Sequence, residues 1–193
     1  MTGAPTEARP RRRPVRWLLR QVERCLALVG LGTIVYFTCF SLSRVTSDSM
    51  APTLKGHDWQ SGDVVLSERI SYWFRRPRRW ELIAFRNAQG VQVMKRVVGL
   101  PRERVQMLRG GHILIDGQPI ERPGPLAWLE YFPYGNLTSD KPPAECGDGY
   151  YVLGDQSRDS DDSRFNGPVQ PDQLRGRPWL ILAPSQRRGF VNP

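Results

Sequence analysis

The sequence is short of the side chains that most often carry enzyme chemistry. It has two histidines, His57 and His112, three cysteines, and only three lysines among its 28 basic residues. The cysteines give no sign of a disulfide framework, because two of them lie at or within an apolar run. Neither histidine is accompanied by a recognisable orienting acid. A Ser-His-Asp triad assembles in space rather than in sequence, so it stays open as an alternative.

Acidic residues are sparse at the start of the chain. Residues 1–24 hold seven arginines and two glutamates, so they contribute +5 of the net charge of +9. A basic tract of this kind could bind nucleic acid. Here an apolar segment of membrane length follows directly, which favours a membrane-flanking role. We therefore expect no nucleic-acid partner.

The run CLALVGLGTIVYFTCFSLS, residues 25–43, contains no charged residue. At 1.5 Å per residue, a helix of this length spans about 28 Å, close to the hydrocarbon core of a bilayer. A cleaved signal peptide remains an alternative, because small residues follow in SLSRVTSDS. We predict an uncleaved, single-pass anchor in the inner (plasma) membrane, with membrane lipid as a partner. The arginine-rich flank predicts a cytoplasmic tail at 1–24 and an extracytoplasmic domain at 44–193.

The residues after the anchor form short β-type runs separated by turn sequences. These runs are DVVLSERI (63–70), WELIAFRN (80–87), VQVMKRVVGL (91–100), ERVQML (103–108), HILIDGQPI (112–120), YYVLGD (150–155) and RPWLILAP (177–184). Strands at this spacing predict a mostly β fold, an antiparallel sheet or barrel-like domain. Residues 121–149 are predicted to be an inserted loop region.

Two serines, Ser47 and Ser49, stand one residue apart in VTSDSMAPTL, shortly after the anchor. They could form a simple turn where the chain leaves the bilayer. Alternatively, one of them is a nucleophile, which requires a nearby base. The base must then come from another segment of the chain.

Lys95 is a candidate for the base. The alternation in VQVMKRVVG puts it on one face of a strand with Val91, Val93 and Val97. Desolvation there would lower its pKa and leave the amine able to accept a proton. The competing interpretation is a lysine at the edge of a sheet that extends to solvent.

A third segment, LGDQSRDSDDSRFNG (153–167), is rich in acids. The clustered aspartates could bind calcium. However, the order differs from an EF-hand loop, which has a glycine at the sixth position and a closing glutamate. Interleaved arginines would compete with a cation, so we expect no metal and no cofactor. Asp162 and Arg164 are spaced to form an ion pair.

The segments SDSMAPTL, VMKRVVGLP and GDQSRDSDDSR, in this order behind an anchor, resemble the motifs of type I signal peptidases, the bacterial serine/lysine leader peptidases. SGDVVL (61–66) matches another segment of that family. The resemblance covers roughly residues 15–185 and implies a serine endopeptidase that removes signal peptides from secretory preproteins. It also implies roles for six side chains: Ser49 as nucleophile, Lys95 as general base, Ser47 in the oxyanion hole, Ser160 orienting the lysine, and Asp162 with Arg164 as a structural ion pair.

The substrate is expected to bind in extended form, as a strand added beside Val91–Lys95. We expect Met50, Val93 and Met94 to contact it, and we expect the chain to act as a monomer. Two other functions remain open. One is a dedicated peptidase for a single pilin or transfer protein, and the other is a catalytically silent, anchored adaptor domain.

The sequence departs from the family pattern at three places. Trp80-Glu81 stands where the family has Gly-Asp, and Pro101-Arg102-Glu103 stands where it has Pro-Gly-Asp. Gln156-Ser157 replaces Asn-Arg in the last motif. None of these positions carries the predicted nucleophile or base.

Overall fold

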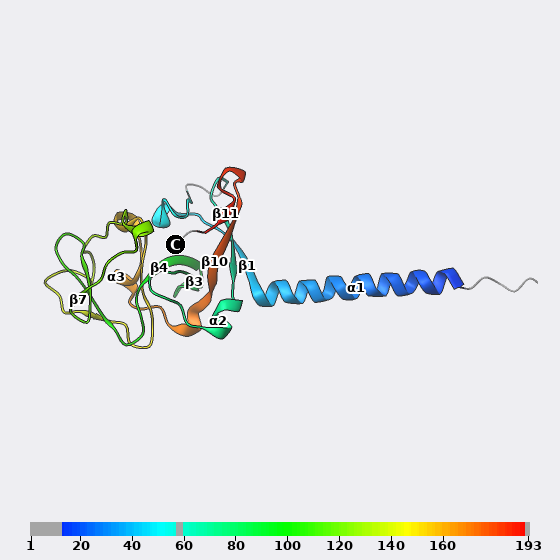
Figure 1. Ribbon diagram of the computed structural model, residues 1–193, viewed down its shortest axis with the longest axis horizontal. Helices are drawn as coiled ribbons and strands as arrows, with labels where there is room; N and C mark the ends of the chain where they lie inside the picture. The colour runs from blue at the N-terminus through cyan, green and yellow to red at the C-terminus, as the bar shows by residue number, and fades with distance from the viewer. Residues whose placement is uncertain (1–12, 57–59, 192–193) are drawn as a thin grey trace, which may run out of the picture. The chain divides into compact units, whose positions relative to one another are not determined.

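The computed structural model describes residues 13–56 and 60–191 (Figure 1). The chain separates into two compact units, Met1–Thr38 and Cys39–Pro193. His57, one of the two histidines considered above, lies outside the described residues.

The first unit consists largely of helix α1 (Arg13–Cys39). Its segment Val15–Cys39 is long and apolar enough to cross a membrane, with a mean hydropathy of 1.5. Apolar side chains of this helix are exposed, for example Leu26 at 67% and Phe37 at 70%. The helix ends four residues before the apolar run does, because residues 40–43 pair as a strand.

The second unit is built on a seven-stranded antiparallel sheet in the order β1-β2-β10-β3-β4-β9, with β11 paired to β10 (Figure 1). Its strands are β1 (Phe40–Arg44), β2 (Val64–Glu68), β3 (Leu82–Arg86), β4 (Gln92–Gly99), β9 (Tyr151–Leu153), β10 (Leu174–Ala183) and β11 (Gly189–Phe190). The prediction of a mostly antiparallel β fold is confirmed.

A second, four-stranded sheet has the order β7-β6-β5-β8. Its strands are β5 (Arg104–Met107), β6 (Ile113–Ile115), β7 (Gln118–Pro119) and β8 (Ala144–Glu145). Short helical turns connect the strands: α2 (Ile70–Phe74), α3 (Ser163–Asn166), η1 (Asp48–Met50), η2 (Gly124–Leu126), η3 (Ser157–Asp159), η4 (Pro171–Gln173) and η5 (Ser185–Arg187). α2, β1, β8 and β11 are elements that the sequence pattern did not predict.

The alternation in β4 places its side chains against two different cores. Val93 and Val97 pack with Ile83 in one cluster, whereas Met94 packs with Leu82 in another. The β3–β4 register pairs Ile83 with Lys95. Lys95 therefore belongs to the valine face, as the period-2 pattern predicted.

Residues 121–149 have little regular structure, yet they are part of the core. Leu126, Leu129, Tyr131 and Leu137 are all buried in the cluster that also holds Trp80 and Val105. This segment therefore closes one side of the larger apolar cluster rather than projecting from it.

Two of the departures from the family pattern occupy positions with positive φ. Trp80 has φ 69° and Arg102 has φ 71°. Glycine adopts this conformation at little cost, whereas a residue with a Cβ adopts it with strain of about 1–2 kcal/mol. The turn at Arg102 is nevertheless held, because the carboxylate of Glu103 accepts a hydrogen bond from the Leu100 N–H at 2.7 Å and pairs with Arg79.

Candidate active site

Ser49 is presented by η1, a single tight turn that follows the extended residue Ser47. Three contacts hold this turn. The Asp48 carboxylate accepts the Gly56 N–H at 3.0 Å, and the Ser49 carbonyl accepts the Gln156 N–H at 3.0 Å. The neighbouring Met50 side chain is buried and ties the turn to the core. The serine hydroxyl is thus attached to a fixed backbone.

The side chain of Lys95 reaches this hydroxyl from β4. Its Nζ lies 2.7 Å from the Ser49 Oγ and 3.0 Å from the Ser160 Oγ. Lys95 is only 2% exposed. The Ser47 and Ser49 hydroxyls are 3.2 Å apart. The structure therefore brings together four residues from three segments that are far apart in the sequence.

A chain of polar contacts continues from Ser160 into the protein. Its hydroxyl donates to the Asp162 carboxylate at 2.7 Å, and the same carboxylate accepts the Gly154 N–H at 3.0 Å. Arg164 pairs with Asp162 at 2.8 Å, and both side chains are fully buried. The guanidinium also donates to Ser157. The predicted Asp162–Arg164 pair is thus present beside the lysine.

The site is assembled around a close approach at Gly154. A Cβ at this position would lie 2.1 Å from the Ser160 Oγ and 2.6 Å from the Ser49 carbonyl oxygen. Since no real side chain tolerates such distances, only glycine lets these two serines come together here.

Sequence reasoning missed a second buried ion pair, which contacts the segment that follows the nucleophile. Arg96 donates to both carboxylate oxygens of Asp155, at 2.7 and 2.6 Å, and to the Trp80 carbonyl at 2.8 Å. Thr53 joins this network from the segment that follows Ser49. The available signal was a second basic residue, Arg96, among the valines of this strand, and its partner cannot be identified from sequence spacing.

Burial sets the protonation of Lys95. Desolvation lowers its pKa from the usual value of 10.5 to about 8, while the negative charges of Asp162 and Asp161 oppose this shift. With this pKa the amine is neutral in about a tenth of the molecules at pH 7 and in about half of them at pH 8. A neutral amine at 2.7 Å can accept the proton of a serine hydroxyl.

A cleft of about 420 Å³ opens beside Ser49 and Lys95. It has an apolar wall and a polar rim. The apolar wall includes Phe85, Val93, Val152 and Val169. The rim includes Asn87, Gln89, Asp159, Asp161 and Asn166. An extended peptide can therefore place side chains on the apolar wall while its backbone remains near the polar groups.

The predicted substrate contacts fall in different places. Val93 lines the cleft, but Met50 and Met94 are buried in the core cluster that contains Leu82. Contact of these two methionines with a substrate stays a prediction. His112 is exposed immediately before β6, and the cleft lining among the described residues contains no histidine.

The departures in the last motif leave the site intact. The Gln156 backbone binds the Ser49 carbonyl, and the Ser157 hydroxyl accepts from Arg164 and from the Phe132 N–H. The arginine that follows these two positions, Arg158, stacks over the Phe132 ring at 4.4 Å. Within residues 13–56 and 60–191, no group of three histidine, cysteine or acidic side chains is arranged to hold a metal ion.

A family model described as signal peptidase, peptidase S26, matches residues 18–183. The chain belongs to the signal peptidase family. The signal peptidase I of Leptolyngbya laminosa is 35% identical over 158 residues, which cover 77% of this chain and 71% of that protein. A probable signal peptidase I-2 of Synechocystis is 30% identical, with coverage of 88% and 73%.

A crystal structure of a signal peptidase I from Enterococcus faecalis aligns with a TM-score of 0.43 and 30% identity, covering 53% of this chain and 97% of that one. Membership of the signal peptidase family makes this chain a serine endopeptidase, a hydrolase of peptide bonds.

Proposed function

We propose that this signal peptidase family member is a membrane-anchored endopeptidase that removes signal peptides from exported proteins, using Ser49 as nucleophile and Lys95 as general base. The observation that supports this most strongly is the 2.7 Å contact between the Lys95 amine and the Ser49 hydroxyl at a buried position. The direct test is cleavage of a purified preprotein with mapped product termini, compared with the Ser49→Ala variant.

In the acylation step, Lys95 takes the proton of the Ser49 hydroxyl while Oγ attacks the scissile carbonyl. The negative charge that develops on the carbonyl oxygen needs hydrogen-bond donors in fixed positions. We assign this role to the Ser49 backbone N–H and the Ser47 hydroxyl, which is 3.2 Å from the nucleophile. Lys95 then gives its proton to the leaving amine, and the acyl-enzyme ester remains.

In the deacylation step, the neutral Lys95 amine removes a proton from water, which attacks the ester carbonyl. Collapse of the second tetrahedral intermediate releases the carboxylate product and returns the proton to Ser49. Ser160 orients the amine through both steps, because its hydroxyl lies 3.0 Å from Nζ and is itself fixed by Asp162.

The sheet offers a place for an extended substrate. Strand β9 pairs with the Arg96–Gly99 part of β4. Among the described strands, the Gln92–Lys95 part has a partner on one side only, namely β3. A substrate strand added on the other side would bring its scissile bond to Ser49.

The strand geometry leads to a prediction about specificity. Alternate side chains of a bound strand point toward the enzyme, so the first and third residues before the cut enter the same wall. We expect small residues at both positions, and we expect Ala→Phe at the first position to lower kcat/KM at least about 100-fold. Peptide cleavage measured by mass spectrometry tests this. Equal cleavage of the Ala and Phe peptides would contradict the proposed binding mode.

The pKa of Lys95 predicts the pH dependence. Only the neutral amine accepts the serine proton, so kcat/KM should rise about tenfold per pH unit below a pKa of about 8 and level off above it. Initial rates between pH 6 and 9.5 give the profile. A flat profile, or a rise centred near 6.5 as for a histidine, would argue against Lys95 as the base.

The charge distribution predicts the orientation of the chain. Relatives in this family are associated with membranes, and α1 is long enough to span one. The seven arginines of residues 1–24 favour a cytoplasmic N-terminus. Protease added outside intact spheroplasts should therefore digest the β-rich unit. Protection of that unit until the cells are lysed would reverse the proposed orientation.

A further inference from the structure

Six arginines line a groove that has no part in the peptidase chemistry. The groove has a volume of about 940 Å³ and lies between α2, the end of β3, the turn before β5 and the start of β10. Asp148 is the one carboxylate in its lining. The arginines are Arg69, Arg75, Arg76, Arg86, Arg102 and Arg175.

Most of this positive charge has no partner of opposite sign within the part of the chain that the structure describes. Arg75 pairs with Glu81, and Arg102 approaches Asp148 only to 4.0 Å at an exposed position. The side chain of Arg69 donates to the Arg175 carbonyl at 3.0 Å, which fixes its direction without neutralising it. The groove therefore keeps a strong positive potential.

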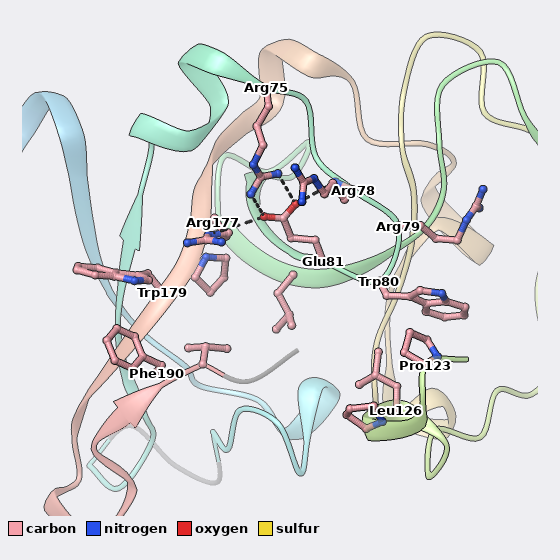
Figure 2. A pocket seen from close by; sticks show the side chains of 14 residues that line it. Arg75, Arg78, Arg79, Trp80, Glu81, Pro123, Leu126, Arg177, Trp179 and Phe190 are labelled. Atoms are coloured by element: carbon pink, nitrogen blue, oxygen red, sulfur yellow. Dashed lines mark hydrogen bonds and ion pairs between the residues drawn. The ribbon is translucent and has the colours of Figure 1, made fainter. Parts of the chain in front are cut away.

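The adjacent pocket in Figure 2 is a useful contrast. There Arg75 and Arg177 point toward Glu81, at 2.7 and 3.8 Å, and the backbone N–H of Arg78 donates to the same carboxylate. Trp179 lies on another wall of this 480 Å³ pocket (Figure 2). Three of the four arginines that line this pocket form ion pairs, Arg75 with Glu81, Arg79 with Glu103 and Arg177 with Glu68, so it offers an anion less unpaired positive charge than the groove does.

Exposed aromatic side chains flank the arginine groove. Trp73, on α2, lines the groove and is 56% exposed, and the next residue, Phe74, is 82% exposed. Tryptophan is favoured at the boundary between lipid headgroups and acyl chains. A row of arginines beside such residues suits the surface of a membrane better than a soluble anion.

The backbone of one groove residue is hydrogen-bonded to Cys39, the first residue of the β-rich unit. The carbonyl of Cys39, the last residue of α1, accepts the backbone N–H of Arg69 at 2.8 Å. Arg69 directly precedes α2 and is itself part of the groove lining. In an anchored chain, the residue at which the helix ends lies at the level of the headgroups.

We propose that the arginine groove binds the phosphate groups of anionic phospholipids in the membrane that anchors the chain. Guanidinium groups bind phosphate oxygens in bidentate fashion, and anionic surfaces attract each nearby arginine. The lipid is assigned on three grounds: the unneutralised charge, the flanking Trp73 and Phe74, and the bond from Arg69 to Cys39. The inference rests on the proposed anchoring but not on the proposed peptidase chemistry.

The test measures binding of labelled phosphatidylglycerol to the full chain in uncharged maltoside micelles. The groove variant is Arg76→Gln with Arg86→Gln, because both side chains are exposed on the groove. The matched control is Arg104→Gln with Arg109→Gln, two exposed arginines of the four-stranded-sheet region. At about fivefold per arginine, the groove variant should bind roughly 20- to 30-fold more weakly. The control should stay within twofold of the unaltered chain, and circular dichroism confirms that all variants are folded.

Competition separates the possible ligands. Unlabelled phosphatidylglycerol should displace the label, whereas phosphatidylcholine and glycerol 3-phosphate should not. Equal binding by the groove variant, or equal competition by phosphatidylcholine, would overturn the proposal. Displacement by glycerol 3-phosphate or by a single-stranded oligonucleotide at equal concentration would overturn it in favour of a soluble anion. Repeating the titration with Ser49→Ala keeps this result independent of the peptidase mechanism.

Discussion

Replacing Lys95 by arginine is expected to reduce turnover by about 10⁴-fold while leaving the fold intact. Arginine keeps the positive charge and a similar length, but its guanidinium does not deprotonate in proteins and so cannot accept the Ser49 proton. The lysine can do so because burial lowers its pKa to about 8. The measurement is the rate of single-turnover cleavage of a preprotein, with the folded state checked by circular dichroism.

The chain offers a matched control for this change. Lys55→Arg alters another of the three lysines, at an exposed position outside the cleft lining. It should keep the activity of the unaltered chain within about twofold, as expected of a surface substitution. Retained activity in Lys95→Arg would return a histidine base to consideration, and both His57 and His112 could then be tested by substitution.

Periodicity predicted much of the fold because strand pairing and side-chain alternation are local properties. The runs around Val64–Glu68, Leu82–Arg86 and Gln92–Gly99 all form strands, and the pairing of β4 with β3 puts Lys95 on the valine face. The turn at Asp116-Gly117 has positive φ at both residues, which is what a tight hairpin requires.

What the sequence could not show depends on contacts between distant segments. The end of α1 at Cys39 cannot be read from the apolar run, because strand β1 forms only by pairing with β2, whose residues follow from Val64 onward. The burial of Leu126 and Leu129 is likewise decided by packing and not by local pattern.

The resemblance supplied the proposed site residues and the Asp162–Arg164 pair, but it did not supply the pair of Arg96 with Asp155. The Ser49, Lys95 and Ser160 segments carry motifs that can be matched one by one. Arg96 and Asp155, by contrast, are connected only by a contact across 59 positions. Only the structure identifies these two residues as partners, because it shows both side chains fully buried and in contact at 2.6 Å.

That buried pair carries the second large prediction. Asp155→Asn should lower the free energy of unfolding by about 3–5 kcal/mol, because it leaves the Arg96 guanidinium buried without a counter-charge. This would be a large part of the total stability, which is about 5–15 kcal/mol for a typical domain. Urea unfolding of the full chain in detergent, followed by tryptophan fluorescence, measures the change.

The variant Asp116→Asn serves as the control, because it removes the carboxylate of an exposed ion pair instead of a buried one. Asp116 pairs with Arg104 at 3.7 Å, but both side chains are more than half exposed, so this change should cost about 0–1 kcal/mol. A similar small cost for Asp155→Asn would mean that water or another group already stabilises Arg96. If the large cost is found, the double variant Arg96→Met with Asp155→Leu should recover part of it, because an apolar pair removes the unpaired charge. Such recovery would show that Asp155 is needed to neutralise the buried charge of Arg96, next to the segment that carries Thr53 and Ser49.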